Sequence, residues 1–212
     1  MKIGIQISGR GSNMQALVAA CAEPDFPAKV ALVISNDPSA AGLEWAEGQG
    51  IATAAISHKG MDREAHERLM DAALMDAGVE LVCNAGYMRV LTPWFVEKWR
   101  DKTINIHPSL LPSFPGLDTH ARALKEGVRW HGCTVHYVRA PVDEGPIIAQ
   151  AAVPVAADDT PDTLAARVLK AEHELYPVAL SLVASGRAPV VDERVALPNG
   201  ALPDSICHPG KF

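Results

Sequence analysis

Two polar residues on one short predicted strand have the types and spacing that suit acyl-group transfer. Asn105 and His107 lie two residues apart in the segment 103–107, which ends at Pro108. Successive side chains of a strand point to opposite faces, so Asn105 and His107 share one face while Ile106 turns into the core. An amide donor beside an imidazole can stabilise a tetrahedral, negatively charged intermediate and can move a proton.

A carboxylate that can assist the imidazole lies in the polar loop 139–146, between two predicted strands. Asp143 lies within this loop, which Gly145 and Pro146 close. A carboxylate beside His107 would orient the imidazole and raise its pKa above the usual value of about 6.5. The structural alternative is that His107 is a buried histidine bonded to backbone and that Asp143 only forms a turn.

The first predicted strand, residues 2–8, runs into a glycine-rich turn of the kind that binds phosphate. Gly9-Arg10-Gly11-Ser12-Asn13 precedes a predicted helix, where Ser12 and Gln15 form a capping-box pattern. Glycines let an anion approach the backbone, and free N–H groups at a helix start point toward it. Met14 occupies the place of the third glycine of the dinucleotide fingerprint, and no Gly-Lys-Ser/Thr follows. A sugar phosphate therefore fits this turn better than NAD, and the alternative is a tight turn without a ligand.

Strand and helix patterns alternate over the first half of the chain and predict an α/β protein. Further strands are expected at 30–35, 51–56, 79–85, 103–107, 132–138 and 147–155, and helices at 12–21, 40–49, 62–77 and 160–184. Right-handed crossovers give a Rossmann-like, mostly parallel, twisted sheet with helices on both faces, and we expect the late strands to be partly antiparallel. Pro177 should kink or split the last helix. We expect one domain over residues 1–186 and a C-terminal extension over 187–212.

Composition excludes several classes of protein. The 212 residues are 48% hydrophobic and 21% charged, with a net charge of −6, which is typical of a soluble globular protein. The acidic balance argues against a nucleic-acid partner, and the apolar runs are too short to span a membrane. Four scattered cysteines, without a C-x-x-C pair, suit a reduced, cytoplasmic protein.

No metal site is expected, although His131, Cys133 and His136 have a metal-like spacing. On a strand His136 takes the face opposite to the other two, so the three side chains cannot converge. His136 is expected near the loop 139–146 instead.

Four motifs in the chain resemble those of one known family. The motifs occur in order along residues 1–186: Gly-Arg-Gly-Ser-Asn at 9–13, Ala-Gly-Tyr-Met-Arg-Val-Leu at 85–91, Asn-Ile-His-Pro-Ser-Leu-Leu-Pro at 105–112 and Val-Asp-Glu-Gly-Pro-Ile-Ile at 142–148. Together they resemble the phosphoribosylglycinamide formyltransferases, also called glycinamide ribonucleotide transformylases, of the folate-dependent formyltransferase family. The resemblance implies the formyltransferase fold and transfer of a formyl group from 10-formyltetrahydrofolate, a co-substrate, to the amine of N1-(5-phosphoribosyl)glycinamide in purine biosynthesis.

The resemblance also implies roles for individual residues. Asn105, His107 and Asp143 would be catalytic, and the acceptor substrate would be held by Gly11, Ser12, Asn13 and Glu172. The folate would be bound by Arg63, Met88, Arg89, Val90, Leu91, Asn105, Ala140, Pro141 and Val142. The family fold further implies a cis bond between Leu111 and Pro112.

Two positions depart from the family pattern, and other functions stay open. Leu169, followed by Lys170, stands where relatives often carry Lys or Gln near the ribose, and Asn84 replaces a more usual apolar residue.

The alternative functions are those of another formyltransferase or a hydrolase that uses 10-formyltetrahydrofolate, and of a nucleotide-binding oxidoreductase in which Asp37 would bind the ribose. A formyltransferase acting on tRNA, or a hydrolase, would need a further domain that this sequence is not expected to carry. We expect only small-molecule substrates, no membrane partner, and a monomer or homodimer.

Overall fold

The computed structural model describes residues 1–197, so residues 198–212 of the expected C-terminal extension, with Cys207, lie outside the described residues. The strands are β1 (Lys2–Ile7), β2 (Lys29–Ser35), β3 (Thr53–Ala55), β4 (Leu81–Asn84), β5 (Thr103–His107), β6 (Trp130–Tyr137), β7 (Ile147–Pro154), β8 (Val190–Val191) and β9 (Arg194–Val195). The helices are α1 (Ser12–Cys21), α2 (Ala41–Gly48), α3 (Arg63–Asp76), α4 (Pro93–Lys98), α5 (Thr119–Glu126) and α6 (Pro161–Ala184).

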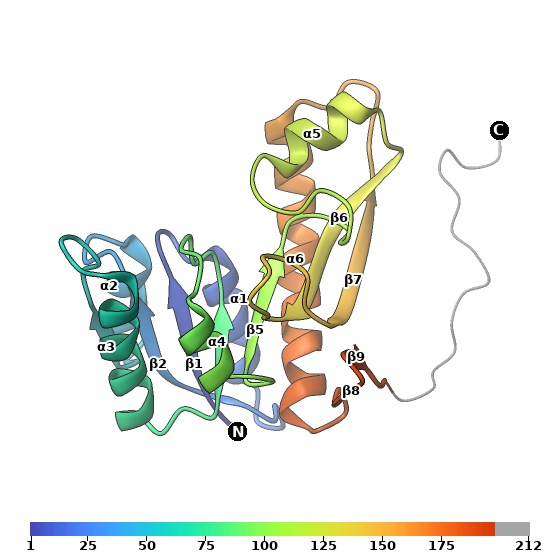
Figure 1. Ribbon diagram of the computed structural model, residues 1–212. Helices are drawn as coiled ribbons and strands as arrows, with labels where there is room; N and C mark the ends of the chain where they lie inside the picture. Colours follow the sequence, from blue (N-terminus) through green and yellow to red (C-terminus); the bar gives the residue numbers. More distant parts are fainter. Residues whose placement is uncertain (198–212) are drawn as a thin grey trace.

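Seven of these strands form one sheet in the order β3-β2-β1-β4-β5-β6-β7 (Figure 1). β1 to β5 pair in parallel, whereas β6 and β7 pair antiparallel with β5 and with each other. The strand order reverses between β1 and β4, and such a switch point is where open α/β sheets bind ligands, outside the carboxyl ends of the strands. The predicted fold class, including the antiparallel late strands, is confirmed.

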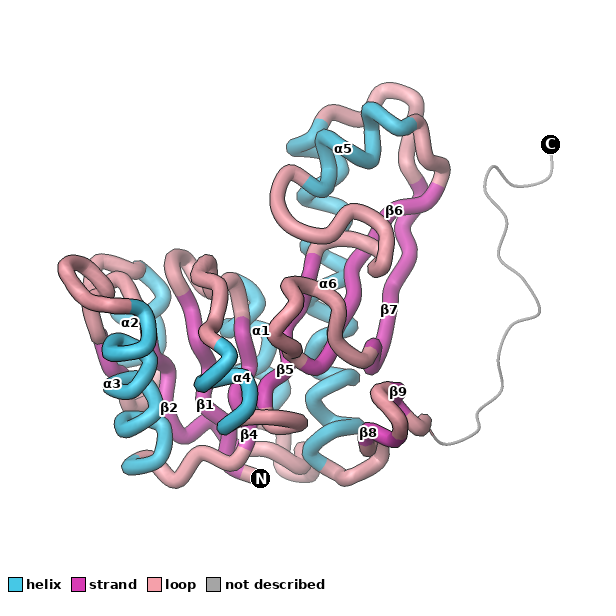
Figure 2. Tube along the Cα trace, in the orientation of Figure 1, coloured by secondary structure: helices cyan, strands magenta, loops and turns pink. Residues whose placement is uncertain are grey.

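Helices cover both faces of the sheet, and each face has its own apolar core (Figure 2). On the face of α1 and α6, Ile5 and Ile104 pack with Leu17 and Tyr176. On the face of α3 and α4, Ile34 packs with residues of those two helices. The alternation along each strand therefore sends one set of side chains into each core.

The helices differ from the expected pattern in the cap of α1 and in the absence of a break at Pro177. Gly11, with φ 71°, is the N-cap of α1, and Ser12 makes no capping hydrogen bond because it is already the first helical residue. α6 runs unbroken from Pro161 to Ala184, so Pro177 does not split it. Buried side chains on both sides of Pro177, among them Tyr176 and Leu180, hold the helix on the sheet although one N–H donor is missing.

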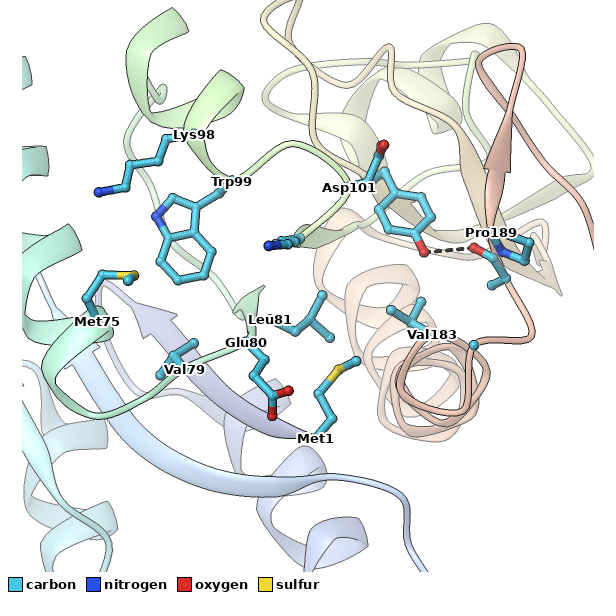
Figure 3. Close-up of a pocket in the computed structure, with 14 residues that line it drawn as sticks. Met1, Met75, Val79, Glu80, Leu81, Lys98, Trp99, Asp101, Val183 and Pro189 are labelled. Carbon is cyan, nitrogen blue, oxygen red and sulfur yellow. Dashed lines mark hydrogen bonds between the residues drawn. The ribbon is translucent and has the colours of Figure 1, made fainter.

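The end of the described chain packs against the same domain. After α6, β8 and β9 form a small hairpin, and Ala188 accepts a hydrogen bond of 2.8 Å from the buried Tyr137 hydroxyl (dashed line in Figure 3). A hollow of about 620 Å³ lies beside this contact, at the amino ends of the central strands, with Met75, Trp99 and Val183 around it (Figure 3). Residues 187–197 are thus part of the domain rather than a separate body. Over the described residues, no helix has the length and apolar character needed to span a membrane.

Candidate active site

A pocket of about 560 Å³ lies at the carboxyl ends of β1, β4 and β5, where the strand order reverses. The predicted site residues that line it are Asn13, Met88, Arg89, Val90, Leu91, Asn105, His107, Ala140, Val142, Asp143 and Glu172. Gly11, Ser12, Arg63 and Pro141 do not line it. We take this pocket as the candidate site, rather than the slightly larger hollow at the opposite edge, because the amide, imidazole and carboxylate groups predicted for catalysis converge here.

The predicted catalytic groups come together although Asp143 is distant in sequence. Nδ1 of His107 lies 3.3 Å from Oδ2 of Asp143, and both side chains are nine-tenths buried. Asp143 has φ 60°, a backbone conformation that Asp tolerates, and its Oδ2 also accepts a hydrogen bond of 2.8 Å from the Gly116 N–H. Nε2 of His107 lies 3.0 Å from the carbonyl oxygen of Phe114. Each ring nitrogen of His107 thus faces an oxygen acceptor, an arrangement that suits a doubly protonated imidazolium.

A second histidine completes this cluster. His136 on β6 is the register partner of Asn105, and its Nε2 lies 3.2 Å from Nδ2 of Asn105. Burial lowers the pKa of His136, and its Nδ1 lies 2.9 Å from the Tyr137 carbonyl. The ring is therefore neutral, with Nδ1–H donating to that carbonyl and Nε2 accepting from the Asn105 amide. Its Nε2 lies 3.8 Å from Oδ1 of Asp143, and a neutral ring forms no ion pair there.

His136 was absent from the predicted catalytic set, although it was expected near this loop. The signal that could have assigned it is the antiparallel register, which pairs the strand of Asn105 with that of His136. The hydrogen bond turns the Asn105 amino group toward His136, and the second hydrogen of that group stays available to a ligand.

Asn13, the last residue of the glycine turn, and Glu172 of α6 also line the pocket. Nδ2 of Asn13 donates a hydrogen bond of 2.7 Å to Oε2 of Glu172, and both side chains are buried. Burial is the main influence on the Glu172 carboxyl and raises its pKa, while the Asn13 hydrogen bond acts in the opposite direction. The structure thus joins two residues that are far apart in sequence and were both predicted to hold the acceptor.

This pKa shift predicts how Glu172→Gln changes stability. Because the folded-state pKa is raised, ionisation destabilises the folded protein as the pH increases above the ordinary value of 4.5. We expect Glu172→Gln to raise Tm at pH 8 by about 2–4 °C, which corresponds to roughly 1 kcal/mol, and to leave it unchanged at pH 4. Thermal unfolding followed by circular dichroism measures the difference. Glu174→Gln, at an exposed position of the same helix, is the control, and an equal Tm change at both pH values would contradict the prediction.

The predicted folate segment follows β4 along one wall of the pocket. Met88 and Val90 are exposed, whereas Leu91 is buried. The Met88 N–H donates a hydrogen bond of 2.8 Å to Oγ of Ser8, so this segment is tied to the end of β1. Burial raises the pKa of Tyr87, also in the lining, to about 12, so this phenol stays protonated at neutral pH.

The three residues with metal-like spacing, His131, Cys133 and His136, all lie on β6. His131 lies beside His120 of α5, with 3.2 Å between two ring nitrogens, and burial lowers the pKa of His131 to about 4. Over residues 1–197 the structure shows no cluster of three or more His, Cys, Asp or Glu side chains with the geometry of a metal site.

The fold and the pocket define a class: α/β proteins with a small-molecule site at the switch point and an amide–imidazole–carboxylate set suited to acyl-group transfer. A family model described as formyl transferase matches residues 1–180. The chain belongs to this formyl transferase family, so the family resemblance noted in the sequence is confirmed.

Named relatives and solved structures agree with this membership. The phosphoribosylglycinamide formyltransferase of Escherichia coli (strain K12) is 42% identical over 204 residues, 96% of this chain and 96% of that protein. The trifunctional purine biosynthetic protein adenosine-3 of Homo sapiens is 49% identical over 186 residues, and the chain spans only 18% of its length. The crystal structure of glycinamide ribonucleotide transformylase 1 from Symbiobacterium toebii has a TM-score of 0.91 and 44% identity, covering 94% of both chains. A formyltetrahydrofolate deformylase from Pseudomonas syringae pv. tomato has a TM-score of 0.87 and 25% identity, over 93% of this chain and 66% of that one.

Proposed function

We propose that this protein transfers the formyl group of 10-formyltetrahydrofolate to the amine of N1-(5-phosphoribosyl)glycinamide. The observation that carries the proposal is one pocket lined both by the Asn105–His107–Asp143 cluster and by the hydrogen-bonded pair of Asn13 and Glu172. A formyl donor and a phosphorylated acceptor need these two kinds of surface side by side. The E. coli and S. toebii proteins, which are similar over nearly their whole length, carry names for this activity.

In the proposed reaction the acceptor amine attacks the formyl carbon directly and forms a tetrahedral oxyanion. The free hydrogen of the Asn105 amino group and the Nε2–H of His107 donate to this oxygen. The Phe114 carbonyl, which Nε2 faces in the free protein, must give up this contact first. Asp143 keeps His107 oriented and cationic through Nδ1. As the C–N10 bond breaks, His107 is the proposed donor of a proton to N10 of the folate, and the proton that the attacking amine loses returns to His107.

The acceptor is proposed to lie beside Asn13 and Glu172. Its phosphate would bind the N–H groups that α1 presents after Gly11, and its ribose would bind Glu172. Leu169 offers no polar group to the ribose, so Glu172 bears more of this interaction. The free thiols of Cys21, Cys83 and Cys133 support the expected reducing, cytoplasmic setting.

A substitution at Gly42 of α2, which does not line the pocket, tests the proposed phosphate site. The Gly42 N–H donates a hydrogen bond of 3.1 Å to the Gly9 carbonyl, and an added Cβ would lie 2.5 Å from Cδ1 of Ile7 and 3.0 Å from that carbonyl oxygen. Gly42→Ala should therefore displace the glycine turn and raise the acceptor KM about tenfold, the equivalent of one lost hydrogen bond. The KM for the folate should stay within twofold.

Gly48→Ala in the same helix is the matched control, because its Cβ would meet no atom within 4 Å. Steady-state kinetics with each substrate varied in turn measures both constants. An unchanged acceptor KM in Gly42→Ala would argue against phosphate binding at this turn.

The reaction itself is tested by following 10-formyltetrahydrofolate with and without the acceptor. Consumption that needs the acceptor, with formylated product formed in equal amount, supports the proposal. Consumption without the acceptor, with release of formate, would support hydrolysis, the activity named for the P. syringae relative. Saturable binding of NAD(P)H at micromolar concentration would favour an oxidoreductase. Two observations argue against the oxidoreductase. Asp37 does not line the pocket, and its carboxylate already accepts hydrogen bonds from Ser39.

A further inference from the structure

The loop 139–146, which carries Asp143, buries little surface that could hold it in place. Residues 140–142 and 144 are exposed, so they pack against little of the protein. The Asp143 carboxylate must nevertheless stay 3.3 Å from Nδ1 of His107 for the proposed reaction. The position of this carboxylate therefore depends on side-chain contacts that connect the loop to the rest of the domain.

Arg139, the first residue of the loop, supplies such contacts through its guanidinium. Its Nη2 donates a hydrogen bond of 2.6 Å to Oδ1 of Asp101, and its Nε donates one of 2.7 Å to Oε2 of Glu193. Its Nη1 donates one of 3.0 Å to the Val138 carbonyl. Although charged, the side chain is only 9% exposed, and a buried guanidinium needs such acceptors. One side chain thus connects the loop both to the segment before β5 and to the β8–β9 hairpin.

The two carboxylates that bind Arg139 belong to residues with an unusual backbone conformation. Asp101 and Glu193 both have φ 57°. Asp192 and Glu193 form the two-residue turn of the β8–β9 hairpin, both with positive φ, and Gly is favoured at the second position of such a turn. Strained residues persist where contacts determine them, and they gather at functional sites. The contacts that Glu193 gains are its ion pairs with Arg139 and Arg100.

We propose that Arg139 is a positioning residue for the reaction: bound to Asp101 and Glu193, it keeps the loop in the conformation that places the Asp143 carboxylate at His107. This inference rests on the proposed function. Arg139 lies four residues before Asp143, so it acts through the loop rather than on the reacting atoms. A misplacement of about 1 Å in a catalytic group can cost 10²-fold in rate. A partly released loop should therefore cost less than loss of the Asp143 charge itself.

Arg139→Met tests this role by steady-state kinetics. Its kcat should fall about tenfold, with both KM values within about threefold of the wild type. Asp101 and Glu193 are about half exposed, so water can solvate their carboxylates in the variant, and the protein should fold. Glu193→Gln is the second variant, should Arg139→Met not fold, and its kcat should fall about threefold.

Arg100→Met is the matched control, because Arg100 also pairs with Glu193 but does not line the pocket. Its kcat should stay within twofold of the wild type. The double variant Arg139→Met/Asp143→Asn then separates positioning from general stability. Adding Arg139→Met to Asp143→Asn should change kcat by no more than twofold, since the carboxylate that Arg139 positions has already lost its charge.

Four results would overturn the assignment of Arg139 while leaving the proposed function intact. They are wild-type kcat in both Arg139→Met and Glu193→Gln, an equal loss in Arg100→Met, losses that multiply in the double variant, and a rise in KM that exceeds the loss in kcat. The last result would mean that Arg139 binds a substrate directly. A wild-type protein without acceptor-dependent formyl transfer would contradict the proposed function, and the inference with it.

Discussion

His107→Ala is expected to lower kcat by about 10²–10³-fold while leaving the protein folded. His107 can both donate to the oxyanion and supply a proton to the leaving nitrogen. Its Nδ1 already faces the Asp143 carboxylate at 3.3 Å, so the ring is held in place before a substrate binds. Alanine removes the donor and the acid together, whereas the contacts that hold the two substrates remain.

The test compares kcat, both KM values and Tm of His107→Ala with those of the wild type. KM values within about threefold and an unchanged far-ultraviolet spectrum would place the loss in the chemical step, as expected when an interaction made only in the transition state is removed. His173→Ala on α6 is the control, because His173 does not line the pocket. A folded His107→Ala protein with near-normal turnover would refute the mechanism.

Much of the fold could be predicted because local patterns and global topology agree in this chain. The alternating strand at 103–107 and the helix bounded by Asp62 and Gly78 have the predicted limits within a residue or two. α4 and α5 were missed: α4 has only six residues, and neither repeats an apolar pattern long enough to be distinguished from a loop. Their helical state depends on caps and tertiary contacts, such as the hydrogen bond from the Phe95 N–H to the Thr92 hydroxyl.

The part of the candidate site that lies on a single strand could be predicted from the sequence. Period-two alternation places Asn105 and His107 together, but it does not give the register of β5 against β6, which brings in His136. The pairing of Asn13 with Glu172 depends on the packing of α6 against α1, which is a long-range contact. Arg63 and Pro141 came from resemblance alone, and the free pocket does not include them.

Asp143→Asn is expected to cost about 10³-fold in kcat, because the role of Asp143 depends on its charge. Asn has nearly the same shape and tolerates the positive φ of this position, so the loop should keep its path. Asn can also still accept a hydrogen bond from the Gly116 N–H. The buried negative charge 3.3 Å from Nδ1 is lost, and an imidazolium is then no longer stabilised in a site shielded from water. The structure therefore separates charge from shape in a single substitution.

Measurement of kcat, both KM values and Tm distinguishes this role from a merely structural one. If the charge of Asp143 supports the imidazole in the chemical step, Asp143→Asn should lose kcat while both KM values stay within about threefold of the wild type and Tm is unchanged. Glu144→Gln, at the exposed neighbouring position, should retain the wild-type rate. A small loss of kcat in Asp143→Asn would mean that the carboxylate only shapes the loop through Gly116 and that its charge does not act on His107.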